Sequence, residues 1–413
     1  MSTVAIVDGY STGGTLGRML AERGVTCVHV RSSAVVGEYF RTSFRAGDFV
    51  ADLGFRPDPA ELCGLLREYG VDQVVAGTES GVILADTLNH LLGTPGNDIA
   101  TLAARRDKAA MAETVRAAGL AAPRGRTFDD ADTAADWCAT ALGGAAAVVK
   151  PVDSAGTDNV HFCHRTDQVR AASARILGGV NLYGSPNRNV LVQERVVGTE
   201  YYVNSVSAAG VHRIAEIWRY TKRPGPTGSP IYDFEVPVDL ASAEAEPVRA
   251  FVGAVLDAVG VRSSAAHTEI MLTDAGPVLI ETGARLGGAT LPHVVEKFSG
   301  VSQAALFAAA LHDVRSLVAF DDRAPRWTAA VRNVALVNPV PVERQSGEWL
   351  ARIAELPTVV AVSGNPNPGA ELPMTVDLIS SPGFVYLASD DLREVERDYR
   401  ALRELEQRRC YGT

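Results

Sequence analysis

The sequence predicts an α/β fold that opens with a parallel, Rossmann-like sheet, and three observations support this. Over the first hundred residues, short apolar runs alternate with helix-like segments, as strands joined by crossover helices do. From about residue 122 the strand-like runs are spaced differently, which indicates a second, smaller α/β unit. From about residue 316 strand patterns and a charged final helix indicate a distinct C-terminal α+β region.

The N-terminal elements follow from apolar periodicity and from the Gly and Pro residues that end each run. Strands are expected at 3–8, 25–30 and 71–77, and helices at 15–24 and 58–70. The pattern at 98–120 predicts one long helix, because it ends at Gly119 and Pro123 follows.

The middle of the chain carries shorter strand signals. Strands are expected at 145–151, 160–164 and 189–196, followed by a hairpin at 198–220 that turns at Ala208–Gly210. The next segment, TKRPGPTGSP at 221–230, is rich in Pro and Gly and predicts a mobile loop. A helix is expected at 245–260.

Composition and charge exclude several classes of partner. The chain has 413 residues, enough for two to four domains, and its hydrophobic fraction of 46% provides ample core material. The formal net charge of −10 argues against nucleic acid and against an anionic membrane surface as partners. No run approaches the roughly 18 apolar residues of a membrane span. We therefore expect a protein without a membrane or nucleic-acid partner.

The five cysteines point to a reducing compartment. They are scattered and form no CxxC pair, which fits reduced thiols better than a disulfide framework or a zinc site. The N-terminus enters a strand-like run directly, so no signal peptide is expected. Together these features predict a cytoplasmic protein.

Two glutamates are predicted to oppose each other in a hairpin at 267–283. The turn material at 273–277 is centred on Ala275, so Glu269 and Glu281 should face each other across it. The opposite face would carry Ile270, Leu272, Val278 and Ile280 as a core layer. Like charges opposed in this way are destabilising unless something compensates them.

A magnesium ion would provide that compensation, because it prefers oxygen ligands and is commonly held by one or two carboxylates together with phosphates. Arg285 would place a guanidinium nearby, which suits a phosphoryl group or a carboxylate. The alternative is that both glutamates are exposed to solvent and Arg285 simply pairs with one of them.

Three further stretches carry residue types that bind nucleotides. Lys150 leaves a strand next to the small-residue loop 153–157, which suits a phosphate, although the Walker A pattern is absent. Gln193, Glu194 and Glu200 follow another strand and could contact a purine and a ribose. Lys108 lies in a charged helical segment. Taken singly, each is better explained as an ordinary surface charge.

Taken in order, these residues resemble the signature of the ATP-grasp superfamily. The series VVKP, SAGT, QERVVGTE and ETGARLGG is specific as a set, and the resemblance covers about residues 1–315. Within the superfamily the chain resembles the carboxylate–amine ligases, in particular the L-amino acid ligases that make dipeptides. VDGYSTGG at 7–14 and AGTESGVILAD at 76–86 are similar to the N-terminal patterns of that group.

The resemblance implies an ATP-grasp fold with an N-terminal Rossmann-like domain at 1–100, an ATP-grasp domain at 101–315 and a C-terminal domain at 316–413. Its lid would span about 122–205. The implied cofactors are ATP and Mg²⁺, with Mn²⁺ as a substitute. The implied partners are small amino acid substrates, and a homodimer is compatible with the resemblance.

The resemblance also assigns roles to single residues. Lys108 and Lys150 would bind the ATP phosphates, and Glu269 and Glu281 would bind magnesium. Arg285, Glu281 and Lys150 would act in catalysis, with Arg285 stabilising the acyl phosphate or the tetrahedral intermediate. The remaining nucleotide contacts would come from the loop residues Ser154, Ala155, Gly156 and Thr157, from the adenine-binding residues Gln193, Glu194, Arg195 and Val196, and from Glu200 at the ribose. Many family members have Asn where this chain has Gly283, which leaves a second magnesium in doubt.

Candidates for substrate selection rest on weaker patterns. Glu79 could pair with an amino group, and His267 could act near the incoming amine. The other candidates are Trp218, Tyr232, Gly287 and His293, together with Arg285. The alternatives are that Glu79 is an exposed acid, that His267 has a structural role, and that Trp218 packs within a strand.

The implied function is an ADP-forming ligase that activates an amino acid carboxylate as an acyl phosphate and joins it to an amine, giving a dipeptide or amide. An ATP-grasp carboxylase or a purine-pathway ligase is an alternative. A nucleotide sensor or dehydrogenase is a third, although the GYSTGG turn does not give GxGxxG.

Overall fold

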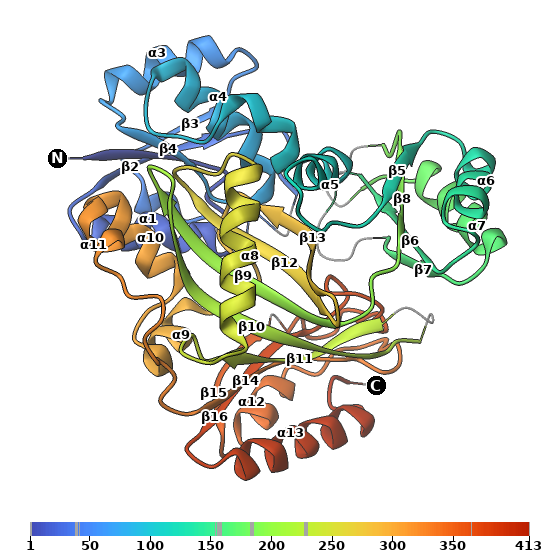
Figure 1. Ribbon diagram of the computed structural model, residues 1–413. Coiled ribbons are helices and arrows are strands. Elements are labelled where there is room, and N and C mark those ends of the chain that lie inside the picture. Colours follow the sequence, from blue (N-terminus) through green and yellow to red (C-terminus); the bar gives the residue numbers. More distant parts are fainter. Residues whose placement is uncertain are drawn as a thin grey trace.

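The computed structural model describes residues 2–37, 40, 42–152, 154, 159–181, 186–226, 230–364 and 366–412, which form three sheets (Figure 1). The first sheet is parallel, with strand order β3-β2-β1-β4, as the N-terminal alternation predicts. Its strands are β1 (Thr3–Val7), β2 (Thr26–Arg31), β3 (Ala51–Phe55) and β4 (Gln73–Ala76). The adjoining helices are α1 (Gly13–Ala21), α3 (Pro59–Glu68) and α4 (Val82–Leu92), with the short turns η1 (Ala46–Asp48) and η2 (Glu79–Gly81).

The predicted long helix at 98–120 is wrong, because the chain breaks it into two pieces. They are η3 (Ile99–Arg105) and α5 (Lys108–Ala117). Asp107 separates them, and its carboxylate accepts hydrogen bonds from the backbone N–H groups of Ala109 and Ala110. Such an N-cap starts a new helix, so Lys108 becomes the first residue of α5.

The second sheet, called here the small sheet, is antiparallel with strand order β5-β8-β6-β7. It comprises β5 (Gly125–Phe128), β6 (Ala147–Pro151), β7 (His161–Cys163) and β8 (Val190–Glu194), with helices α6 (Ala131–Ala141) and α7 (Thr166–Leu177). Its core is its own, built from residues such as Phe128, Val149, Ile176 and Val192. The unit projects to one side of the molecule (Figure 1).

The third sheet is central and has strand order β13-β12-β9-β10-β11-β14-β16-β15. Its strands are β9 (Thr199–Ala208), β10 (Val211–Pro224), β11 (Pro230–Val238), β12 (Ala265–Thr273), β13 (Gly276–Gly283), β14 (Ala330–Ala335), β15 (Val359–Gly364) and β16 (Gly383–Ser389). The strands after residue 316 continue this sheet, because Glu235 of β11 pairs with Asn333 of β14. The predicted domain boundaries stay predictions.

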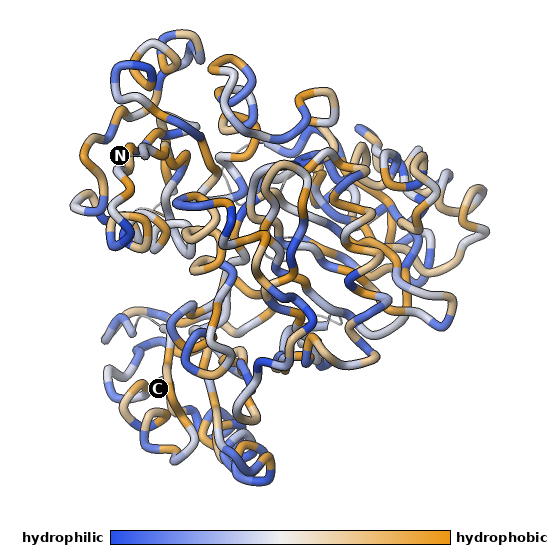
Figure 2. The backbone as a smooth tube through the Cα atoms, turned by 60° about the vertical axis from the view of Figure 1, so that its left-hand side comes forward, coloured by the Kyte–Doolittle hydropathy of each residue, from blue (hydrophilic) through white to orange (hydrophobic). Residues whose placement is uncertain are grey.

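Six further helices complete the described chain. They are α8 (Ala245–Ala258), α9 (Pro292–Ser299), α10 (Gln303–His312), α11 (Val314–Val318), α12 (Trp349–Ala354) and α13 (Leu392–Gln407). Figure 2 shows hydrophilic residues along the outermost of them, α13. In the described residues no single helix meets the length and hydropathy of a membrane span; the bent pair α9 and α10, at 91° to each other, meets them only together.

The hairpin of β9 and β10 turns at Ala209 and Gly210, as predicted, and both have positive φ. The loop predicted at 221–230 is shorter than expected, because β10 and β11 pair as far as Pro224 and Pro230. Proline is tolerated at strand ends, where its missing N–H removes no ladder bond. Residues 227–229 lie outside the described residues.

Candidate active site

The hairpin of β12 and β13 places the two glutamates as predicted, because Glu269 and Glu281 are direct partners in its register. Beyond them the register shifts by one residue, so that Ile270 faces Leu279. The predicted core position of Ile280 is therefore wrong: Leu279 is 1% exposed in the core, whereas Ile280 lines a cavity. A bulge of this kind re-aims a side chain.

Both glutamates line a cavity of about 1180 Å³. Its walls come from the central sheet, from the small sheet and from the turns after β4 and β13. A cavity of this size can enclose a nucleotide together with a small substrate.

Glu269 lies among polar side chains that favour its charged form. His267 Nε2 lies 3.7 Å from its carboxylate, and the Tyr220 hydroxyl lies 3.5 Å from it. Burial alone would raise the pKa of this carboxyl. The contact with His267 and the positive charges of Lys222 and Arg285 outweigh burial, so the pKa lies below its ordinary value.

Two lysines face Glu281. Lys108 Nζ lies 3.4 Å from the Glu281 carboxylate and donates a 2.7 Å hydrogen bond to the Ser154 carbonyl. Lys150, at the end of β6, is 7% exposed, and burial lowers its pKa to about 8 although the charge of Glu281 opposes this. The structure thus gathers two cations beside the glutamate pair. Ala155, Gly156 and Thr157 lie outside the described residues.

Glu79 is held between two arginines. Arg106 donates to one carboxylate oxygen and Arg285 Nε to the other, each at 2.9 Å. Burial would raise the pKa of Glu79, but the charges of Arg285 and Arg106 bring it below its ordinary value. Gly283 leaves room for this carboxylate, because a Cβ there would lie 2.4 Å from Glu79 Oε2.

The residues expected at the base and ribose also line the cavity, with partners of their own. They are Gln193, Glu194, Arg195, Val196 and Glu200. Arg124 Nε donates to the Glu194 carboxylate at 2.8 Å, and Lys222 Nζ lies 2.8 Å from the Glu200 carboxylate. The Glu200 side chain is only 14% exposed.

The substrate candidates divide into two groups. Glu79, Tyr232, His267 and Arg285 line the cavity. Trp218 does not: it is fully buried, it stacks on Tyr202, and its indole N–H donates to Glu216. Its prediction as a substrate contact is therefore wrong, and strand packing explains it.

Gly287 and His293 also fall outside the cavity lining. Gly287 N–H donates to the Gln303 side chain, and a Cβ at this position would lie 2.8 Å from Asn204 Oδ1. Gly287 leaves room for the hydrogen bond between His267 and Asn204, and its predicted substrate contact stays a prediction. His293 is exposed on α9 and is not among the residues that line the cavity.

The donor set of the glutamate pair fits a magnesium ion. Glu269 and Glu281 supply carboxylate oxygens on one face of the hairpin, which is the ligand type that Mg²⁺ takes together with substrate phosphates. Among the described residues no group of three or more His, Cys, Asp or Glu side chains is placed to hold a metal by itself. Further ligands would have to come from a bound substrate or from water.

Several lining residues were not predicted. Glu235 of β11 and four apolar residues near the C-terminus, Leu372, Val376, Leu378 and Ile379, reach the same cavity. The alternation of β11 could have placed Glu235 on one face of a strand. No local sequence pattern indicated that residues near 375 would line the same cavity as Glu235, since they lie more than a hundred positions away in the chain.

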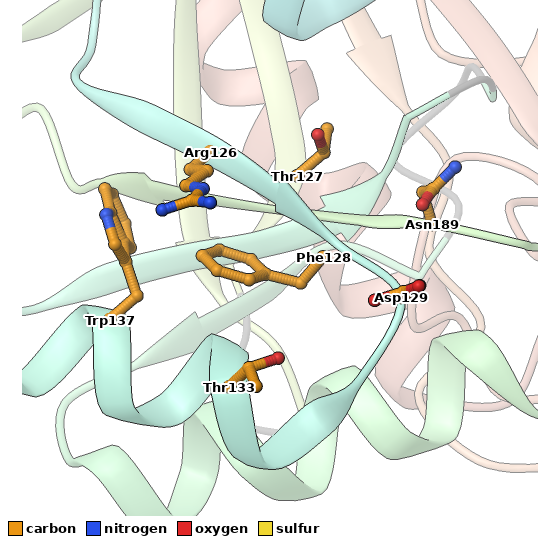
Figure 3. Close-up of a pocket in the computed structure, with 7 residues that line it drawn as sticks. All are labelled: Arg126, Thr127, Phe128, Asp129, Thr133, Trp137 and Asn189. Atoms are coloured by element: carbon orange, nitrogen blue, oxygen red, sulfur yellow. The ribbon is translucent and has the colours of Figure 1, made fainter.

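A second hollow of about 470 Å³ lies on the small sheet. Arg126, Phe128 and Trp137 are among the seven residues that line it (Figure 3). It shares no lining residue with the large cavity, and neither glutamate of the pair reaches it.

Comparisons with known proteins agree with this geometry. Residues 144–293 match the family model of the ATP-grasp domain. Dapdiamide A synthase of Enterobacter agglomerans is 31% identical over 416 residues, and the match covers 96% of each chain.

Solved structures share the whole fold. The L-amino acid ligase from Bacillus licheniformis superposes with a TM-score of 0.74 at 17% identity, covering 98% of this chain and 97% of that one. A carboxyaminoimidazole ribonucleotide synthase from Aspergillus clavatus, complexed with ATP, gives 0.70 at 14% identity, covering 98% and 99%. At these identities the likeness concerns the fold.

Proposed function

The chain belongs to the ATP-grasp carboxylate–amine ligases, and from that premise we propose which side chains of the cavity serve each part of the reaction. The enzyme uses ATP and Mg²⁺, forms ADP, and joins an amino acid carboxylate to an amine. A carboxylate is a poor electrophile, so it must first be phosphorylated before an amine can attack it.

The observation that carries the assignment is the opposed pair Glu269 and Glu281 with the two lysines beside it. We assign the magnesium ligands to this pair and the ATP phosphates to Lys108 and Lys150. Magnesium supplies charge neutralisation of the polyphosphate. The lysines orient the terminal phosphate and offset the charge of the phosphoryl group as it moves.

Arg285 is assigned to the reacting carboxylate. Its Nε and one terminal nitrogen already donate to Glu79 and to the Leu286 carbonyl, at 2.9 Å each, which fixes the guanidinium plane. A fixed guanidinium beside the glutamate pair can stabilise the acyl phosphate and the oxyanion that forms when the amine attacks. Glu79 is assigned to an amino group of a substrate, since its carboxylate faces the cavity.

His267 is assigned a place beside the incoming amine. Its Nδ1 is 2.8 Å from Asn204 Oδ1, which leaves Nε2 on the side of Glu269. The small sheet is assigned the role of the lid, because Lys150, Ser154 and Gln193 lie on it or beside it and line the cavity. Closing such a lid excludes water, which would otherwise hydrolyse the acyl phosphate.

Ser154 is assigned to the phosphates, and Gln193, Glu194, Arg195 and Val196 to the adenine. Glu200 is assigned to the ribose, with Lys222 holding its carboxylate. The product is proposed to be a dipeptide or amide. A cytoplasmic location is supported by the five cysteines, which are all free and buried. A homodimer stays a proposal to be tested by light scattering.

The test is ADP release in the presence of ATP, Mg²⁺ and pools of amino acids. Release that requires two amino acids supports the proposed function, and mass spectrometry identifies the product. Release that requires bicarbonate instead would support a carboxylase and contradict the proposal.

Glu281→Gln tests the site assignment, because it removes a charged ligand and preserves the shape. We expect its rate to fall by roughly 100-fold or more while the circular dichroism spectrum is unchanged. Glu113→Gln, on the exposed side of α5, is the matched control. Equal rates in Glu281→Gln and the wild type would contradict the assignment.

A further inference from the structure

The proposed function leaves one part of the cavity without an occupant. This part, called here the recess, is lined by Glu235 on β11 and by the apolar residues Leu372, Val376, Leu378 and Ile379. We propose that the recess binds the basic side chain of one amino acid substrate, with its ammonium group at Glu235 and its methylene groups along Val376, Leu378 and Ile379. The proposal rests on the proposed function and names the class of one substrate.

The sheet register places Glu235 on the same face as the glutamate pair. Direct partners share a face, and Glu269 pairs with Tyr202, which pairs with Trp218. Tyr220 is two positions after Trp218, so it lies on that face as well, and its direct partner is Glu235. All these side chains therefore lie on one face of the central sheet, and Glu269, Tyr202, Tyr220 and Glu235 also line the cavity.

The distance between the two sites requires a long side chain. β12 and β11 are separated by β9 and β10, and strands are about 4.8 Å apart, so the backbones of Glu269 and Glu235 are about 14 Å apart across the sheet. Tyr220 spans part of this distance, since it pairs with Glu235 while its hydroxyl lies 3.5 Å from Glu269. A group that reacts near Glu269 and also reaches Glu235 must be carried on an extended substrate.

Glu235 has one carboxylate oxygen available for a ligand. The side chain is about nine-tenths buried, at 9% exposure. Its Oε2 accepts hydrogen bonds from the Tyr202 hydroxyl at 2.9 Å and from Asn333 Nδ2 at 3.1 Å. Within the described residues Oε1 has no hydrogen-bond partner and is not sealed from the cavity.

The charge around Glu235 favours a cation. Among the described residues no Lys or Arg pairs with it, and its charged neighbours Glu269 and Glu216 are both acidic. Burial and these neighbours raise the pKa of Glu235 to about 7. Buried carboxylates are normally paired, so an ammonium group from the substrate would remove an existing penalty.

The other lining residues of the recess are apolar. Ile379 is 51% exposed, and it lies in a turn that Ser380 closes: Ser380 Oγ accepts from the Val376 N–H at 2.9 Å, and its own N–H donates to Asp377 at 2.8 Å. Thr375 N–H donates to the Asn338 carbonyl at 2.9 Å and anchors the turn to the sheet side. Aliphatic stems of basic side chains pack on such surfaces while the charged end finds a carboxylate.

Lysine and norleucine provide the test, because they have the same methylene chain and only lysine carries the ammonium group. Each is supplied to the full-length enzyme with ATP, Mg²⁺ and a pool of the other amino acids, and ADP release is measured. We expect kcat/KM for lysine to exceed that for norleucine by about tenfold or more, the gain of one charge-assisted hydrogen bond.

Glu235→Gln should raise the KM for lysine by about tenfold and bring the lysine-to-norleucine ratio close to one. Ile379→Ala, at an exposed position that cannot unfold the core, should raise the KM for both amino acids by similar factors. Glu355→Gln, exposed at the end of α12, is the matched control and should leave the ratio unchanged.

Two results would contradict the proposal for the recess and leave the proposed function standing. One is a wild-type enzyme that uses norleucine as well as lysine; the other is a Glu235→Gln enzyme with the wild-type lysine-to-norleucine ratio. In both cases ADP release with two amino acids would still support the ligase. Absence of ADP release with every amino acid pair would instead overturn the proposed function and the recess with it.

Discussion

Glu79 and Arg285 explain why position 283 of this chain is a glycine. Glu79 Oε2 fills the volume that a Cβ of Gly283 would occupy, and Arg285 holds the same carboxylate at 2.9 Å. The sequence showed that position 283 departs from the family pattern, but it could not show what replaces the missing side chain. That partner comes from the short turn η2 after β4, about two hundred residues earlier.

Gly283→Ala tests this arrangement. The added Cβ would displace Glu79 from Arg285, and a displacement of about 1 Å in a catalytic site costs roughly 100-fold in rate. We expect kcat/KM for the amino acid substrates to fall on this scale. At Gly288, where a Cβ would meet no atom within 4 Å, substitution by alanine should cost much less. An equal loss in both variants would contradict the steric explanation.

Glu235 predicts a pH dependence of stability in the absence of substrate. Its folded pKa of about 7 is above the ordinary value of 4.5, so the folded state holds this proton more tightly than the unfolded state. The stabilisation is complete below about pH 4.5 and is lost as the pH rises through 7.

Between pH 5 and pH 8 the wild type should therefore lose roughly 2–3 kcal/mol more unfolding free energy than Glu235→Gln. Urea titrations of both proteins at the two pH values measure this difference. Parallel pH profiles of the two proteins would show that Glu235 titrates normally.

At the scale of elements, most strands and the register of the key hairpin could be predicted. Apolar runs and the turn at 273–277 were enough to oppose Glu269 and Glu281. The bulge at Ile280 could not be predicted, because it depends on how two strands pair. The break before Lys108 has a local cause, the Asp107 cap of α5, but the continuous helical pattern at 98–120 masks it.

The break between η3 and α5 matters for the site, because the Asp107 cap of α5 positions Lys108. Asp107→Ala should lower the free energy of unfolding by about 1 kcal/mol and should also raise the KM for ATP. Asp58→Ala removes the comparable cap of α3 and should lower stability similarly without changing that KM. If both variants, or neither, changed the KM for ATP, the cap of α5 would have no special role in nucleotide binding.

At the scale of the whole molecule, the contribution of the C-terminal region to the cavity could not be predicted from the order of the elements along the chain. Its strands extend the central sheet through β14 and β16, and its 372–384 segment forms a cavity wall. The predicted C-terminal α+β character was visible in the sequence. Its contact with residues near 235 was not, because strand pairing between distant segments leaves no local pattern.

The compact arrangement of the three sheets also predicts the behaviour of the cysteines. All five are free and buried, and burial raises the pKa of Cys27 and Cys410 to about 12. A thiol reagent such as DTNB should therefore react slowly with the native enzyme and rapidly with all five thiols in urea. Fast reaction of several thiols in the native enzyme would contradict the buried arrangement.

The most direct measurement is a crystal structure of the enzyme with Mg²⁺ and a non-hydrolysable ATP analogue. We expect a cation that contacts both Glu269 and Glu281 and a polyphosphate within reach of Lys108 and Lys150. A nucleotide bound elsewhere, or the two carboxylates pointing apart with no cation between them, would contradict it.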